Sequence, residues 1–153
     1  MMQFVVEYKA TNFNGEPQYL KDECSFIYTP WNYVDFSIMI GEGYNSLDLN
    51  LDDGYILQLT GFNRNYNWIK KELVLPKFKS GLLKVLFKNN YSPGTGIQYT
   101  TDWHTYFDKK TGWICVGYPD CQSGWESVEF AKNTIAVITD GKIKSVWINP
   151  RFI

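Results

Sequence analysis

Alternation of apolar and polar residues with a period of two is the dominant pattern of this chain. Between positions 34 and 40, apolar side chains recur at every second residue, at Val34, Phe36, Ile38 and Ile40. Successive side chains of a strand point to opposite faces of a sheet, whereas a helix would scatter these residues around its axis. The segment therefore predicts a β-strand with one buried face.

A second alternating run predicts a hairpin and its register. Leucine occupies positions 47, 49 and 51, and apolar residues recur at 55, 57 and 59 after the dipeptide Asp53-Gly54. A two-residue turn at this dipeptide would set Leu49 against Gln58 and mix the two faces. A three-residue loop over 52–54 pairs position 51 with 55, 49 with 57 and 47 with 59, which keeps one face apolar. We therefore predict this loop, with Gly54 left-handed in a bulge.

Two more hairpins are expected further along the chain. Strands over 103–107 and 113–117 flank a glycine-containing turn, and a loop over 109–112 places Phe107 opposite Ile114 and Tyr106 opposite Cys115. Strands over 135–139 and 143–148 are joined by Asp140-Gly141, a strong two-residue turn signal. This last pair is apolar on both faces, so we expect it near the centre of a sheet.

Weaker alternation predicts five further strands, over 3–9, 24–28, 68–75, 82–88 and 126–130. Only residues 17–24 resemble a short helix. Many short strands separated by turn signals are typical of a sandwich or barrel. We predict a mainly β fold in which residues 1–153 form a single domain. Its architecture is a β-sandwich or a strongly bent, barrel-like antiparallel sheet with at most one or two short helices.

Composition narrows the class of protein. The chain is 44% hydrophobic and 18% aromatic with a formal net charge of −1, which excludes global disorder. No stretch is apolar for long enough to span a membrane, and the N-terminus lacks the features of a secretion signal. Three cysteines, an odd number, indicate reduced thiols rather than a disulfide framework. We therefore expect a cytoplasmic protein, and its lysine-rich, arginine-poor composition suggests a bacterial source.

Charge is unevenly distributed along the chain. Residues 16–60 carry eight acidic and one basic side chain, whereas residues 61–90 carry seven basic side chains and Glu72. Two oppositely charged solvated surfaces explain this asymmetry. The overall pI is about 5.8 and only Arg64 and Arg151 are arginine, so we expect no nucleic-acid partner.

His104 is the only histidine of the chain, and a catalytic role would depend on it. The predicted hairpin register gathers on one sheet face the residues Asp102, His104, Tyr106, Asp108, Trp113 and Cys115. A thiol beside an Asp-x-His has the residue types of an activated nucleophile. However, Cys115 would lie in mid-strand, without the helix N-terminus or cationic niche that lowers a thiol pKa. We expect this face to be open to solvent at least in part, and to recognise a partner rather than catalyse a reaction.

No metal or cofactor motif is present. Cys115 and Cys121 are separated by five residues rather than the two to four of a zinc knuckle, and no second Cys or His pair exists. The acidic residues from Asp48 to Asp53 alternate along a strand instead of converging in a calcium loop. Residues 92–96 are glycine-rich but lack the lysine of a phosphate loop. We expect neither a metal nor a cofactor.

Aromatic side chains are the remaining functional signal. Tyrosine and tryptophan that stay exposed on a sheet face bind protein partners or sugar rings at low entropic cost. Mixed aromatic and amide clusters occur at 31–33, 65–68 and 89–91. The candidate binding residues are Trp113, Tyr106, His104, Asp102, Tyr66 and Trp31.

Together these features predict a non-enzymatic binding module whose partner is another protein. The class of small bacterial antidotes to secreted toxins is comparable, although no motif carries that comparison. Two alternatives stay open. One is a domain that binds carbohydrate or another small ligand; the other is a hydrolase that uses His104 with a carboxylate.

Overall fold

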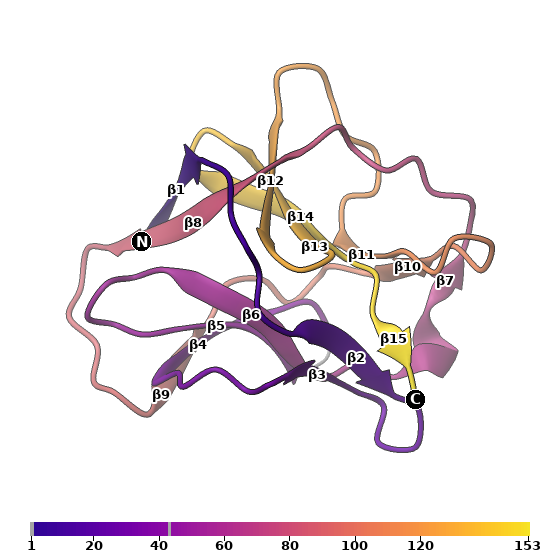
Figure 1. The fold of residues 1–153 in the computed structure, drawn as a ribbon, viewed down its shortest axis with the longest axis horizontal. Coiled ribbons are helices and arrows are strands. Elements are labelled where there is room, and N and C mark those ends of the chain that lie inside the picture. Colours follow the sequence, from indigo (N-terminus) through magenta and orange to yellow (C-terminus); the bar gives the residue numbers. More distant parts are fainter. Residues whose placement is uncertain (1, 43) are drawn as a thin grey trace.

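The computed structural model describes residues 2–42 and 44–153, and it confirms the mainly β fold class (Figure 1). Two mixed sheets pack together as a β-sandwich, and neither sheet closes into a barrel among these residues. The helical structure described is one 3₁₀ turn, η1 (Asn65–Asn67). No helix in the described part of the chain is long and apolar enough to cross a membrane.

The first sheet contains eight strands within the described residues. Their spatial order is β1-β8-β12-β13-β14-β11-β10-β7. Their bounds are β1 (Met2–Tyr8), β7 (Ile69–Lys70), β8 (Lys79–Phe87), β10 (Thr105–Phe107), β11 (Ile114–Gly117), β12 (Glu126–Ala131), β13 (Thr134–Thr139) and β14 (Lys142–Ile148).

The second sheet contains seven strands within the same residues, in the order β15-β2-β3-β6-β5-β4-β9. Their bounds are β2 (Glu16–Leu20), β3 (Ser25–Thr29), β4 (Phe36–Ile40), β5 (Tyr44–Leu49), β6 (Ile56–Phe62), β9 (Thr95–Gln98) and β15 (Arg151–Phe152). Four pairings are parallel, β8 with β12, β7 with β10, β4 with β9 and β2 with β15, so the sheets are mixed rather than purely antiparallel.

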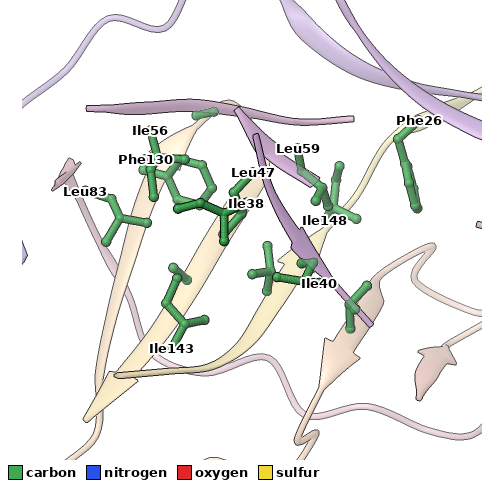
Figure 2. Packing of buried hydrophobic residues seen from close by; sticks show 14 of the residues in the cluster. Phe26, Ile38, Ile40, Leu47, Ile56, Leu59, Leu83, Phe130, Ile143 and Ile148 are labelled. Atoms are coloured by element: carbon green, nitrogen blue, oxygen red, sulfur yellow. The ribbon is translucent and has the colours of Figure 1, made fainter. Parts of the chain in front are cut away.

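The main core lies between the two sheets (Figure 2). Ile38, Leu47 and Leu59 contribute to it from the seven-stranded sheet, and Phe130 and Ile148 contribute from the eight-stranded sheet. In β4 the residues alternate between buried and half-buried, as the sequence pattern predicts. Burial of this apolar surface is the main stabilising contribution to a fold of this kind.

The predicted register is right at one end of the β5–β6 hairpin and wrong at the other. Leu47 pairs with Leu59, as expected, and Gly54 has a φ of 75°, the left-handed conformation. Leu49, however, pairs with Ile56 rather than with Leu57, because a bulge follows Asp48. The bulge shifts Leu57 off the core face and brings Ile56 onto it, where Ile56 is buried.

The turns of the other two predicted hairpins are confirmed, and so is the predicted register of β10–β11, whereas β13–β14 contains a register shift between Val137 and Ile138. Phe107 pairs with Ile114 and Tyr106 with Cys115 in β10–β11. Strands β13 and β14 meet at Asp140-Gly141, where both residues have positive φ. A two-residue turn of this kind matches the twist of the strands that it joins. Both strands lie inside the eight-stranded sheet, as their apolar composition predicts.

Two sequence predictions are wrong. Residues 17–24 form no helix; they contain most of β2 and a following turn, because Tyr19 is drawn into the core beside Phe26. Of the strand predicted over 68–75, only the two residues of β7 form a strand. Beyond it, residues 71–78, here called the crossing segment, run extended over the eight-stranded sheet, where Leu73 and Leu75 pack.

The outer face of the eight-stranded sheet is apolar and covered over β11, β13 and β14. A second cluster consists of the buried residues Cys115, Ile135, Val137 and Trp147, against which Leu73 and Leu75 of the crossing segment pack. The pairing of Cys115 with Trp147 and of Trp147 with Ile135 places these residues side by side on that face.

The outer face of the seven-stranded sheet is polar instead. The buried carboxylate of Asp48 accepts hydrogen bonds from Ser37 Oγ (3.0 Å), Ser46 Oγ (2.7 Å), Gln58 Nε2 (3.1 Å) and the Thr60 hydroxyl. The segment before β4 extends the network, since the Asn32 side chain donates to Gln58 Oε1 (3.1 Å). Neutral donors from three strands thus surround one buried charge.

Candidate functional site

The residues that were expected to share one sheet face, from Asp102 to Cys115, do not all do so. Strand β10 begins only at Thr105, so the strand that was expected to carry Asp102 and His104 beside Tyr106 does not extend to them. The structure separates the candidates into three places. Tyr106 and Trp113 lie on the outer face of the eight-stranded sheet, Asp102, His104 and Tyr66 lie in loops and turns, and Trp31 lies before β4.

The sheet face that was expected to be open is largely covered. Tyr106 and Trp113 are both half-buried, and they pack beside Cys115 in the second cluster. The crossing segment lies over this face, and alternation along β10 and β11 carries no information about such a distant segment. Tyr106 and Trp113 still keep part of their surface exposed, so the face is open only in part.

The Cys115 thiol lies inside this covered cluster. Burial raises the pKa of the thiol, and the Sγ atom lies 3.7 Å from the carbonyl oxygen of Tyr118. A raised pKa disfavours the thiolate, which is the reactive form of cysteine. The environment of Cys115 is therefore that of a core side chain.

Asp108 fastens the crossing segment to the β10–β11 turn. Its carboxylate accepts hydrogen bonds from the backbone N–H of Leu73 (3.0 Å) and from that of Lys110 (3.0 Å). The bond from Leu73 is the main reason why the pKa of Asp108 lies below its usual range, since the bond favours the ionised form. Asp108 is thus a structural anchor rather than a member of an open polar face.

His104 contacts a carboxylate that the sequence analysis did not single out. Its Nδ1 lies 3.2 Å from Glu42 Oε1, and the two side chains are 56% and 58% exposed. Glu42 lies in the turn between β4 and β5, so the pair bridges the two sheets. Asp102 takes no part in the pair; it accepts a hydrogen bond from Thr100 Oγ1 (2.7 Å).

Beside the Glu42–His104 contact lies an aromatic surface centred on Arg64. The Arg64 guanidinium carbon is 5.2 Å from the ring centre of Phe62 and 5.8 Å from that of Tyr66. Tyr44 pairs with Phe62 across β5 and β6. Tyr44 and Tyr66 are 74% and 71% exposed. We call these four residues the Arg64 surface.

A cavity of about 210 Å³ opens between the Arg64 surface and Glu42. Among its lining residues is Asn63, whose Nδ2 donates to Asn45 Oδ1 (3.1 Å) and to Thr105 Oγ1 (3.0 Å). The indole of Trp68 donates to Asn63 Oδ1 (2.8 Å). These buried bonds tie both sheets to the floor of the cavity, and they hold it in one shape.

Sequence reasoning found Tyr66 and His104 but missed Arg64, Glu42, Tyr44 and Phe62. A usable signal for Arg64 was present, since it is one of only two arginines and directly precedes the 65–68 aromatic and amide cluster. Glu42 had no signal. It meets His104 only because the β4–β5 turn and the loop before β10 lie together in the fold.

Trp31 is 60% exposed and lies apart from the residues that line this cavity. Its neighbour Asn32 is hydrogen-bonded to Gln58, as described above, so this segment belongs to the polar outer face. Within residues 2–42 and 44–153, no group of three or more His, Cys, Asp or Glu side chains is placed to hold a metal ion.

The arrangement is suited to recognition by aromatic and charged contacts. A guanidinium held over rings presents a planar set of donors, and the adjacent exposed tyrosines present flat apolar area. The Glu42–His104 pair is open to water, without the desolvation that strengthens electrostatic catalysis. Comparison of the sequence with protein-family models and with curated proteins gave no match.

Proposed function

We propose that the chain is a recognition module that binds another protein through the Arg64 surface. The observation that carries this proposal is the position of Arg64 over Phe62 and Tyr66. Arginine and tyrosine are enriched among the residues that dominate binding energy at protein interfaces. A guanidinium that already rests on two rings loses little conformational freedom when it binds, so more of its interaction energy is retained as affinity.

The chemistry of the surface indicates what the partner presents. Arg64 makes no ion pair with any carboxylate of residues 2–42 and 44–153, so its donors remain available. A carboxylate matches the guanidinium fork with two parallel hydrogen bonds. We therefore expect an acidic side chain of the partner at Arg64, framed by apolar contact with Tyr44 and Tyr66. The Glu42–His104 pair would belong to the polar rim.

The proposal also includes the compartment in which the chain acts, the cytoplasm. The free thiols of Cys24, Cys115 and Cys121 are consistent with a reducing cytoplasm. An antidote to a secreted toxin fits such a setting, and the protein encoded beside this chain is the first partner to test.

The test compares the two arginines of the chain. Arg64→Ala should weaken binding of the purified partner by about thirty-fold or more, the loss typical of an interface hot spot. Arg151→Ala is the matched control, because Arg151 is exposed and lies 3.6 Å from Glu16 in an exposed ion pair. Calorimetric titration gives both affinities, and unchanged thermal unfolding of both variants shows that neither disturbs the fold.

Two results would contradict the proposal. One is equal affinity of Arg64→Ala and Arg151→Ala for the partner. The other is full binding by a Tyr44→Ala/Tyr66→Ala double variant, since these rings supply most of the exposed apolar area of the surface.

The hydrolase alternative rests on one contact, the Glu42–His104 pair. His104→Gln separates the two functions. We expect it to leave partner binding within about three-fold, because exposed ion pairs contribute about 1 kcal/mol or less. A hydrolytic activity that this substitution abolishes would favour the alternative instead.

A further inference from the structure

An open groove lies away from the Arg64 surface. Its volume is about 520 Å³, within the range of small-molecule sites. Residues around β9, β14 and the loops that flank β10–β11 line it, and none of them lines the cavity beside Arg64. Its principal side chains are those of Tyr91, Tyr99, Trp103, Tyr118, Lys142 and Lys144.

The deeper rings of the groove are held in fixed positions. The Tyr99 hydroxyl accepts a hydrogen bond from the Ile143 backbone N–H (3.1 Å) and donates one to the Ile143 carbonyl oxygen (3.4 Å). Its ring packs edge-on against Trp103, with 6.0 Å between ring centres. Trp103 itself is only 7% exposed. The aromatic floor of the groove is therefore formed before any ligand binds.

The charged side chains that line the groove are both basic. Lys142 and Lys144 line it, and no acidic side chain does. Neither lysine forms an ion pair within the described ranges 2–42 and 44–153. Lys144 Nζ instead lies 5.6 Å from the ring centre of Tyr118, an aromatic residue that is 52% exposed. A cation poised beside an aromatic ring can reach an anionic group on a ligand stacked there.

Three other polar side chains that line the groove are already hydrogen-bonded within the protein. The Gln98 amide donates to the carbonyl oxygens of Met39 (3.3 Å) and Thr100 (2.6 Å). The Thr100 hydroxyl donates to Asp102, and the Tyr99 hydroxyl is held by Ile143. A sugar needs many hydrogen-bonding partners for its hydroxyl groups, whereas a flat ring with one acidic group needs stacking surfaces and a cation. The groove offers the second set.

We propose that this groove binds a small planar aromatic acid, with the ring against Trp103 and Tyr118 and the acidic group at Lys142 and Lys144. This site goes beyond the protein-binding function proposed above and uses different residues. Failure of either proposal therefore leaves the other intact.

The test uses three probes and titration followed by nuclear magnetic resonance. 2-Naphthoate carries a planar ring and a carboxylate, 2-naphthalenemethanol keeps the ring without the charge, and glucuronate keeps the charge without the aromatic ring. We expect 2-naphthoate to bind saturably and to shift the indole N–H signal of Trp103. The neutral probe should bind about ten-fold more weakly, a change of about 1.4 kcal/mol, because it loses the charge contacts with both lysines.

Variants of exposed or half-exposed residues locate the site without threatening the fold. A Lys142→Gln/Lys144→Gln double variant should bind 2-naphthoate about ten-fold more weakly but bind the neutral probe unchanged. Tyr118→Ala should weaken both aromatic probes. Tyr33→Ala is the matched control, an exposed tyrosine outside the groove and outside the Arg64 surface, and it should change neither.

Several outcomes would overturn the inference. They are absence of saturable binding of 2-naphthoate, equal affinity for the charged and neutral probes, and unchanged affinity in the lysine double variant. Tighter binding of glucuronate than of 2-naphthoate would replace it with a saccharide site.

Discussion

The two sheets bury their outer faces in opposite ways. The eight-stranded sheet has an apolar outer face, on which Cys115 and Trp147 are covered by leucines of the crossing segment. The seven-stranded sheet has a polar outer face, where Asp48 takes hydrogen bonds from four neutral side chains. Apolar burial is non-directional, so it tolerates changes of shape, whereas a buried carboxylate depends on every one of its donors. The comparison teaches that equal burial need not mean equal tolerance to mutation.

The largest effect is expected on the polar face. Asp48→Ala should lower the free energy of unfolding by about 4 kcal/mol or more, because it removes four hydrogen bonds to a buried charge and leaves their donors unpaired. Urea denaturation of the full chain measures this loss. Ser46→Ala removes a single donor from the same network and should cost about 1 kcal/mol. Similar losses in the two variants would show that Asp48 is not the centre of the network.

A smaller effect is expected from the crossing segment. Leu75→Ala should lower the free energy of unfolding by about 2 kcal/mol, because Leu75 is only partly buried on the apolar face. Val74→Ala is the matched control, since Val74 is the adjacent residue of the segment and is 83% exposed. It should change stability by no more than about 0.5 kcal/mol. If the two variants unfold at the same urea concentration, the segment does not stabilise the sheet beneath it.

A weaker, pH-dependent effect is expected at Asp108. Its carboxyl pKa is lowered in the folded chain, so its contribution to stability is fully present above the unfolded pKa of about 4 and is lost as pH falls through the lowered folded pKa. Asp108→Asn should therefore destabilise the chain at neutral pH, and the difference from wild type should shrink at acidic pH. Unfolding curves across this range measure the difference. A constant difference would mean that the charge of Asp108 is immaterial.

The smallest effect is expected at the exposed contact of Glu42 with His104 between the sheets. Glu42→Gln should change the free energy of unfolding by less than about 0.5 kcal/mol, because the pair is open to solvent. Thermal unfolding at low and high salt measures it. A loss comparable to that of Leu75→Ala would mean that this contact holds the sheets together.

Local pattern was sufficient for most strands and for the register of β10–β11. In that hairpin the turn residues and the alternation both lie within a short stretch of chain, so the pattern determines which residues face each other. The register shift in β13–β14 was not predicted. The bulge after Asp48 escaped prediction. Both Ile56 and Leu57 are apolar, so one extra residue could be absorbed without a visible break in the pattern.

Contacts between distant segments could not be predicted from the local pattern of apolar and polar residues. Nothing in residues 71–78 indicates that they cross β11 and β14, and the parallel pairings likewise join segments that share no turn. The same limit applies to the candidate site. Tyr66 was found because it lies in a dense aromatic cluster, whereas the meeting of Glu42 with His104 needed the fold.

The parallel pairing of β15 with β2 has a consequence for how fast this chain acquires its structure. Arg151 pairs with Gln18 in this parallel pairing, and β1 pairs with β8 in the antiparallel sense. Each sheet therefore contains pairings between segments far apart along the chain. The entropy of closing such large loops is lost before the contacts that reward it can form. We expect the chain to refold in milliseconds to seconds, the range of sandwiches dominated by non-local pairing, rather than in microseconds. During that interval the edges of unfinished sheets are open to other chains.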